Sequence, residues 1–221
     1  MEIGILGAGS VGQAFAKLAL HSGHHIKISN SRGPASLTDL MQKLGPRATA
    51  ATSEEAAQCE MVLLAIPWDD VPKTLSSFGD WGSRILIDAT NPYHGRHGAF
   101  TLADVGNLST SQFVAQLASG AKVVKAINHM IMSNFEAGGD ANGAKRVAFV
   151  AGDDSFALHR GYEHQRSMRR WNARDGRPHC FGGAQRGSGP GNDSRACMVQ
   201  PWSVIPAALA GVVFWTAWRR S

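Results

Sequence analysis

Cysteine is scarce in this sequence. The chain has three cysteines among its 221 residues, Cys59, Cys180 and Cys197, and they are scattered along it. Disulfide frameworks and structural zinc sites need more cysteines at closer spacing, so both classes are excluded. A secretory leader is also lacking, because Met1 leads directly into a run typical of a buried strand. We therefore expect a cytoplasmic protein without a metal site.

A basic binding face is lacking too, although the whole chain has a net charge of +5. Residues 1–152 contain twelve Lys and Arg against twelve Asp and Glu, so this part is neutral. The excess lies in residues 153–221, which contain ten Arg, no Lys and five acidic residues. The folded part therefore has no excess of positive charge with which to bind nucleic acid, and we expect no nucleic-acid partner.

Residues 159–198 contain no Ile, Leu or Val. Gly, Arg, Ser and Pro dominate there, and such a stretch cannot offset a chain entropy of about 1–2 kcal/mol per residue. We expect a first domain at 1–154, a poorly ordered segment at 155–198 and a short apolar segment at 199–221. The roughly fifteen residues at 204–218 fall short of the roughly twenty that span a membrane. A poorly packed or accessory helix is therefore expected there, with a membrane-associated segment as the alternative.

The first 34 residues have the pattern of a dinucleotide-binding βαβ unit. An apolar run at 1–6 leads into a Gly-x-Gly-x-x-Gly turn, a helical segment and a second strand at 25–29. Gly7 allows a sharp turn off the strand, Gly9 the close approach of a pyrophosphate, and Gly12 close packing of the helix. The helix would point its free N–H groups at the phosphates.

The second strand is not followed by the carboxylate that an NAD-preferring site uses to bind the ribose 2′-hydroxyl. Asn30, Ser31 and Arg32 stand at this point instead. A guanidinium suits bidentate binding of a phosphate. We therefore predict NADP(H) as the cofactor, with a solvated loop arginine as the alternative for Arg32.

Strands and helices alternate along the rest of residues 1–154. Strands are expected at 47–51, 61–66, 85–88, 123–127 and 146–151, helices at 35–44, after the capping box at 52–55, at 69–78 and at 109–118, and a long loop at 89–108. This alternation predicts an α/β fold with a Rossmann-type, doubly wound parallel sheet and a ligand at the carboxyl ends of its strands. That edge would carry residues 7–12, 29–32, 67–68, 91–92 and 128–129.

Several motifs in order carry a family resemblance. Besides the N-terminal unit they are Ile-Pro-Trp at 66–68, Ile-Asp-Ala-Thr-Asn-Pro at 87–92, Val-Val-Lys-Ala-Ile-Asn at 123–128 and Phe-Val-Ala-Gly-Asp-Asp at 149–154. Residues 1–154 thus resemble the NADPH-dependent reductases of the deazaflavin coenzyme F420, in particular the bacterial branch described as predicted dinucleotide-binding enzymes.

The resemblance implies an NADP(H) site. Its residues would be Gly7, Ala8, Gly9, Ser10, Val11 and Gly12 at the pyrophosphate, Asn30, Ser31 and Arg32 around the 2′-phosphate, and Pro67, Trp68 and Asn128 near the nicotinamide. The family usually has Asn-Thr where this chain has Asn128-His129. It also continues after Gly-Asp-Asp with an apolar helix, a strand and a Gly-rich closing segment, which residues 159–198 do not match. We hypothesise that the reading frame shifts shortly after Asp154, since GC-rich DNA read out of frame would give this excess of Arg, Gly and Pro.

No Ser/His/Asp or Cys/His set and no paired carboxylates occur at a recognisable spacing. Hydride transfer needs no such catalytic set, because the cofactor carries the chemistry and the protein aligns the reactants. The leading hypothesis is an NADP-dependent oxidoreductase whose small-molecule acceptor is coenzyme F420, a flavin or a similar planar compound. His129 is the one candidate acid, whereas His94 and His97 are expected to be solvated in a Gly-rich loop. The alternatives are an NADP(H)-binding module or inactive remnant without turnover and a membrane-tethered reductase; a homodimer stays open.

Overall fold

The computed structural model describes residues 1–95, 100–129, 131–137, 140–141, 144–145, 147–154, 157 and 196–201. The expectations for 158–195 and 202–221, and that for His97, fall outside these residues.

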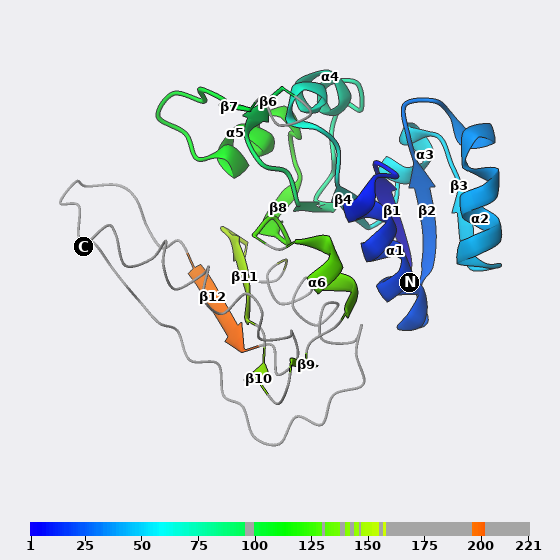
Figure 1. The fold of residues 1–221 in the computed structure, drawn as a ribbon. Helices are drawn as coiled ribbons and strands as arrows, with labels where there is room; N and C mark the ends of the chain where they lie inside the picture. The colour runs from blue at the N-terminus through cyan, green and yellow to red at the C-terminus, as the bar shows by residue number, and fades with distance from the viewer. Residues whose placement is uncertain are drawn as a thin grey trace.

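An eight-stranded sheet forms the centre of the molecule (Figure 1). Its strands, in spatial order, are β12 (Ala196–Pro201), β11 (Val147–Gly152), β8 (Lys122–Ala126), β5 (Ile85–Asp88), β4 (Met61–Leu64), β1 (Glu2–Leu6), β2 (His25–Ser29) and β3 (Ala48–Ala50). The six strands from β8 to β3 are parallel, with the crossover order of a Rossmann fold. The predicted fold class is confirmed.

The sheet departs from parallel pairing at β11, which pairs antiparallel with β8 and with β12. The connection from β8 to β11 contains α6 (Met132–Ala137), which packs against α1 (Ser10–His21), and a two-stranded ladder of β9 (Asp140–Ala141) and β10 (Ala144–Lys145). The direction of a strand depends on such a connection, and the alternation of side chains within the strand does not encode it. An antiparallel edge strand on an otherwise parallel sheet is common in doubly wound folds.

Helices cover both faces of the sheet because its central strands are buried on both sides (Figure 1). One core contains Ile3 and Leu63, and it packs under α1, α2 (Thr38–Leu44) and α6. The other contains Val62 and Leu64, and it packs under α3 (Ser53–Ala57), α4 (Val71–Ser76) and α5 (Thr110–Leu117). Short 3-10 turns, η1 (Pro34–Leu37) and η2 (Trp68–Asp70), precede α2 and α4.

Two capping boxes fix the starts of short helices. Thr52 and Glu55 form reciprocal bonds at the start of α3, as the sequence predicts. Ser109 and Gln112 do the same for α5. The sequence does not indicate how closely α3 lies on the sheet: a Cβ at Gly4 would be only 1.9 Å from the carbonyl oxygen of Ala56. Gly4 therefore allows α3 to pack directly on β1.

The segment expected to be a long loop at 89–108 contains a small antiparallel hairpin. Its strands are β6 (Tyr93–His94) and β7 (Thr101–Leu102). It lies beside α4 and α5 in Figure 1. Two-residue strands are too short to show a period-2 pattern, so the sequence predicts only the turn-forming glycines.

Strand β12 crosses the boundary expected at 198/199, and no strand was predicted there. Its backbone pairs with β11 over six residues, from Val147 opposite Pro201 to Gly152 opposite Ala196. No helix within the described part of the chain is long and apolar enough to cross a membrane.

Candidate nucleotide-binding site

The predicted site residues gather at the carboxyl ends of the parallel strands. The loop after β1 is tied to β2 by a bond from the Gly7 N–H to the Ser29 carbonyl oxygen (3.0 Å). The loop after β4 is tied to β1 by a bond from the Ala65 N–H to the Leu6 carbonyl oxygen (2.9 Å). Backbone bonds thus hold three neighbouring loops together along this edge of the sheet.

The three glycines of the loop after β1 differ in backbone conformation and in the space that a Cβ would have. Gly7 has φ 109°, and a Cβ there would be 2.2 Å from the Ala65 carbonyl oxygen. A Cβ at Gly12 would be 1.9 Å from the Gly7 carbonyl oxygen, so this glycine allows α1 to approach the turn. Gly9 has an ordinary extended backbone (φ −76°, ψ −170°), and no heavy atom would lie within 4 Å of its Cβ. Nothing in the described part of the chain requires glycine at position 9, and the space there can take a ligand.

The first turn of α1 offers unpaired backbone donors. Gly9 is the N-cap residue, no side chain caps the helix, and no acidic residue occupies the first turn. The side chain of Gln13 instead donates to the carbonyl oxygen of Ala8 (2.8 Å), which fixes the loop from within. An open N-terminus of a twelve-residue helix favours an anion through its N–H groups and its dipole.

The loop after β2 is shaped by Asn30. Its Oδ1 accepts a bond from the Arg32 N–H (3.0 Å), and its amide also pairs with the hydroxyl of Ser36. Ser31 and Arg32 are exposed. Among the described residues, no carboxylate pairs with the Arg32 guanidinium. Asn30 therefore has a shaping role, and Ser31 and Arg32 are the side chains that the loop presents to solvent.

The loop after β4 separates two residues that the sequence places together. Pro67 is exposed at the edge of the sheet. Trp68 is buried, with its ring centroid 5.7 Å from that of Phe113 on α5. The indole packs in the core because η2 turns it away from the open edge, so Trp68 supports the loop from inside.

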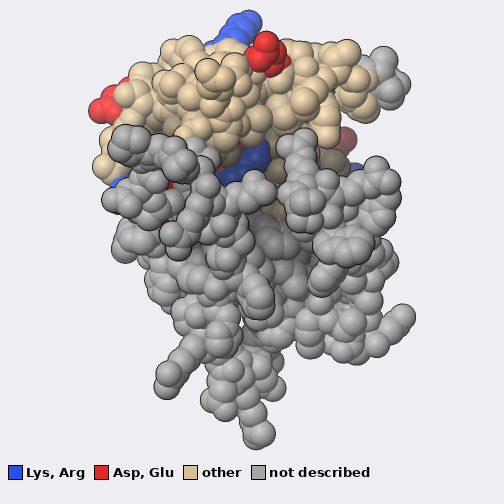
Figure 2. Space-filling view, turned by 90° about the vertical axis from the view of Figure 1, so that its left-hand side faces the viewer, with Lys and Arg blue, Asp and Glu red and all other residues tan. Residues whose placement is uncertain are grey.

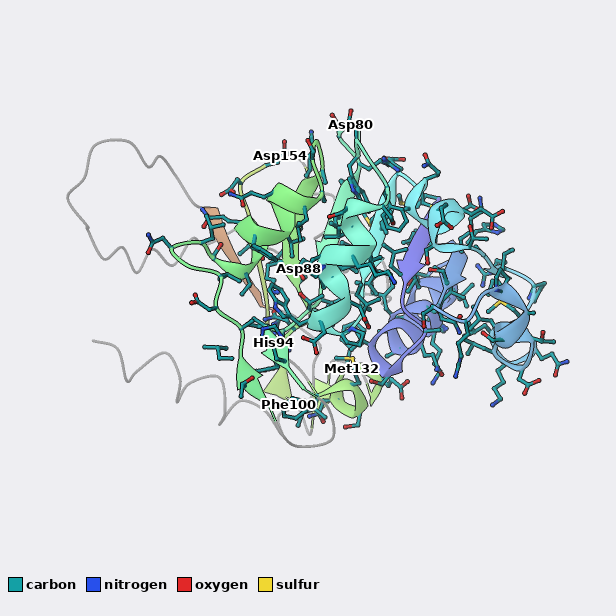
Figure 3. The ribbon with its side chains drawn as sticks, turned by 90° about the horizontal axis from the view of Figure 1, so that it is seen from above. Asp80, Asp88, His94, Phe100, Met132 and Asp154 are labelled. Carbon is teal, nitrogen blue, oxygen red and sulfur yellow. The ribbon has the colours of Figure 1, made fainter. Side chains whose placement is uncertain are left out.

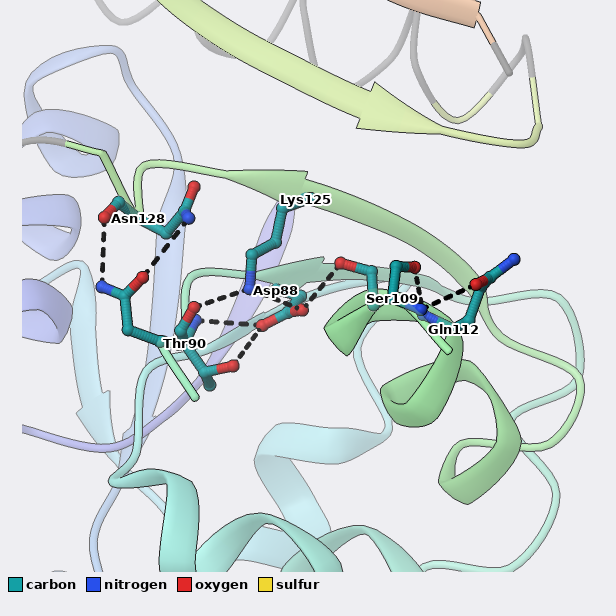
Figure 4. A network of polar contacts seen from close by, with 8 residues as sticks. Asp88, Thr90, Ser109, Gln112, Lys125 and Asn128 are labelled. Carbon is teal, nitrogen blue, oxygen red and sulfur yellow. Dashed lines mark hydrogen bonds and ion pairs between the residues drawn. The ribbon is translucent and has the colours of Figure 1, made fainter. Parts of the chain in front are cut away.

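Two asparagines connect the ends of β5 and β8 (Figure 4). The Asn91 amide donates to the Asn128 carbonyl oxygen (3.1 Å), and the Asn128 amide donates to Asn91 Oδ1 (3.4 Å). Ile127, just before Asn128, has φ 68°, an unusual conformation for a β-branched residue. Backbone strain of this kind often marks functional sites. The sequence indicates Asn128 but not its pairing with Asn91.

Beside this pair lies a buried ionic network that the sequence does not predict (Figure 4). One oxygen of the fully buried Asp88 accepts bonds from the Thr90 N–H (2.9 Å) and hydroxyl (2.7 Å). The other accepts bonds from Ser111 (3.1 Å) and the Lys125 ammonium (3.0 Å), which also donates to the Thr90 carbonyl oxygen (2.6 Å). The sequence indicates this network only by the charged residues Asp88 and Lys125 near the ends of two apolar strands. The network fixes the turn that carries Asn91.

A second missed contact joins the hairpin to the loop after β4. His94 Nδ1 lies 2.5 Å from Asp69 Oδ1, and the Gly95 N–H donates to Asp69 Oδ2 (3.4 Å). His94 remains about half exposed, as the expectation of a solvated side chain requires, but it has a carboxylate partner. Asp69 therefore anchors the hairpin next to Pro67.

Other reactive groups lie outside this edge or are inert. Burial raises the pKa of the Cys59 thiol, so this cysteine stays protonated at neutral pH. In the part of the chain that the structure describes, no group of three or more His, Cys, Asp or Glu is arranged to hold a metal ion. The edge offers a loop at an uncapped helix N-terminus, an exposed arginine and a pair of amides.

Comparison with known proteins agrees with this arrangement. The family model "NADP oxidoreductase coenzyme F420-dependent" matches residues 2–92. A hypothetical protein of known structure from Sinorhizobium meliloti is 33% identical, with 76% of this chain and 80% of that chain covered and a TM-score of 0.69. The chain belongs to the F420-dependent NADP oxidoreductase family. The matched range of the family model includes the glycine loop, Arg32 and Asn91, whereas Asn128 lies beyond it.

Other solved structures resemble this oxidoreductase. A proposed F420-dependent NADP reductase from Arthrobacter is 28% identical, with 76% of this chain and 80% of that chain covered and a TM-score of 0.67. A pyrroline carboxylate reductase from Plasmodium falciparum with NADP bound is 13% identical, covers 76% and 55% of the two chains, and has a TM-score of 0.52. This last likeness shows the fold alone. No curated protein matches the sequence.

Proposed function

We propose that this oxidoreductase transfers a hydride between NADPH and a planar acceptor, namely coenzyme F420, a flavin or a similar compound. The carrying observation is the exposed Ser31-Arg32 pair, which lies after β2 where an NAD site would have a carboxylate. NADPH supplies the hydride from its nicotinamide C4, the acceptor takes this hydride and a proton from solvent, and NADP⁺ is released.

The residues at the site fit a dinucleotide. The open space at Gly9 and the uncapped N-terminus of α1 accommodate a pyrophosphate. Arg32 would pair with the 2′-phosphate, and Ser31 would donate to it. Pro67 and the Asn91–Asn128 pair would orient the nicotinamide ring at the strand ends.

The chain's contribution to hydride transfer is alignment and the exclusion of water. Reacting atoms must be held about 3–3.5 Å apart for an efficient transfer. The Asp88 network and the Asn91–Asn128 pair would hold the nicotinamide end of the site rigid for this purpose. No general acid of the chain is required, because the transferred charge stays on the cofactor and acceptor rings.

A second candidate is an NADP(H)-binding module without turnover. The composition of residues 159–198 favours it, because a stretch without Ile, Leu or Val supplies no branched aliphatic side chains to an acceptor pocket. This candidate shares the cofactor site and differs only in the absence of acceptor reduction.

Calorimetry with NADPH and NADH, followed by NADPH oxidation assays with F420, FMN and ferric acceptors, separates the two candidates. We expect NADPH to bind more tightly than NADH and to be oxidised only when an acceptor is present. Binding without turnover with any acceptor would favour the module. Failure to bind NADPH would contradict both.

Arg32→Asp tests the cofactor assignment. It removes a phosphate-pairing charge and adds a repelling carboxylate, so NADPH affinity should fall roughly 10- to 100-fold and the preference should move toward NADH. Arg47→Asp is the matched control, because Arg47 is exposed at the start of β3, at the opposite edge of the sheet. Equal NADPH affinities in wild type and Arg32→Asp would refute the 2′-phosphate assignment.

A further inference from the structure

The β6–β7 hairpin exposes three large apolar side chains. Tyr93 is 49% exposed, Phe100 58% and Leu102 71%. Tyr93 lies opposite Leu102 in the hairpin, and the ring centroids of Tyr93 and Phe100 are 6.0 Å apart. We call these three residues the hairpin platform. Apolar side chains clustered in this way on a surface mark an interaction site more often than scattered ones do.

The hairpin platform continues directly from the candidate nicotinamide site. The Tyr93 N–H donates to the Asn91 carbonyl oxygen (2.8 Å), and the Ala103 N–H donates to that of Pro92 (2.8 Å). Figure 3 shows His94 and Phe100 on one side of the molecule, with Asp80 and Asp154 on the other. The first side is the carboxyl edge of the parallel strands, because β6 follows the end of β5.

Two features give the hairpin platform a fixed position and a neutral character. Asp69 holds the hairpin through His94 and the Gly95 N–H. The described part of the face drawn in Figure 2, over α5 and the hairpin, is mostly uncharged, with only a few acidic and basic side chains. Such a surface suits an uncharged aromatic ring better than a polyanion.

We propose that the hairpin platform binds the ring of the planar hydride acceptor; this inference rests on the proposed function. Two neighbouring aromatic rings offer a stacking or edge-to-face contact to a heteroaromatic ring. Their position beside Asn91 places such a ring next to the nicotinamide end of the cofactor site. Asp69 acts as a positioning residue, since it contacts the hairpin and not the acceptor.

A second copy of the chain is a poorer occupant. Stable interfaces between proteins use roughly 20–30 residues on each side. The hairpin platform supplies three apolar side chains, enough for one small ring.

Acceptor binding can be measured without turnover. We would follow the fluorescence of riboflavin, FMN and F420 during titration with protein saturated with NADP⁺, for wild type, Phe100→Ser and Leu102→Ser. Thr101→Ala is the control, because residue 101 is exposed on the same hairpin and alternates in direction with Leu102. Calorimetry with NADPH checks the cofactor site of every variant.

We expect Phe100→Ser to weaken acceptor binding about tenfold, as loss of one stacking contact does. Leu102→Ser should also weaken it, because the ring loses an apolar contact. NADPH affinity should stay unchanged in both, and Thr101→Ala should match wild type. Acceptor binding within twofold of wild type in both platform variants would overturn the inference alone. No acceptor binding by wild type that binds NADPH would overturn both the inference and the proposed hydride transfer, and would favour the binding module. Loss of NADPH binding by wild type would refute the proposed function as well. A dimer that Leu102→Ser converts to a monomer in sedimentation, with acceptor binding unchanged, would also overturn it.

Discussion

Two glycines of the loop after β1 differ in whether the packing of the chain requires them. Gly12 is required by the chain, because a Cβ there would meet the Gly7 carbonyl oxygen at 1.9 Å. Gly9 is not, because its backbone angles suit any residue and the space around its Cβ is open. The sequence pattern treats the two alike, and only the structure distinguishes them.

Gly12→Ala should therefore change the stability of the fold, whereas Gly9→Ala should change the affinity for NADPH. Gly12→Ala should lower the free energy of unfolding by about 1–3 kcal/mol through overpacking, measured by urea denaturation. Gly9→Ala should leave stability within about 0.5 kcal/mol of wild type, because surface changes rarely do more. Its NADPH affinity, measured by calorimetry, should fall at least tenfold. A stable Gly9→Ala variant with wild-type NADPH affinity would mean that no ligand approaches position 9.

Elements with a local sequence signal could be predicted, and those set by distant contacts could not. Strand 25–29 and the capping box at Thr52 and Glu55 were predicted correctly, since apolar runs and cap spacing act within a few residues. The antiparallel direction of β11 and the hairpin were missed. The contacts of Asp88 and His94 were missed as well, because each joins residues far apart in the sequence.

The network around Asp88 joins three elements, β5, β8 and α5, so its loss should affect the stability of the sheet. Lys125→Met leaves a buried carboxylate without its cation, which should cost about 3–5 kcal/mol. Adding Asp88→Asn removes the charge and keeps an oxygen for Thr90, so the double variant should be more stable than Lys125→Met alone. Urea denaturation of wild type, both single variants and the double variant measures this coupling. Additive effects of the two substitutions would show that the pair does not act as an ion pair.

At the scale of the whole molecule, packed contacts extend beyond residue 154, where the sequence motifs of the family resemblance end. The Ala157 N–H donates to Asp154 Oδ1 (2.7 Å), the contact expected when Asp154 is a helix N-cap. Ala157 is fully buried in the core under α1. Packed contacts are therefore present as far as Ala157, and the loss of Ile, Leu and Val begins at 159. A chain whose residue 157 is still buried in the core, and whose sequence lacks Ile, Leu and Val from 159 to 198, is the pattern that a frame change would leave.

We predict that one of the other two reading frames of the coding DNA, downstream of codon 158, encodes an apolar residue at every third or fourth position. Such a pattern would form a helix after Asp154 that buries one face against the same core as Ala157. A chain built with that frame should unfold at a higher temperature than the present chain, because more apolar surface is buried. Sequencing the gene and comparing the two chains by thermal denaturation tests this. If neither frame contains the pattern, the frame-change hypothesis is wrong and the tail is native.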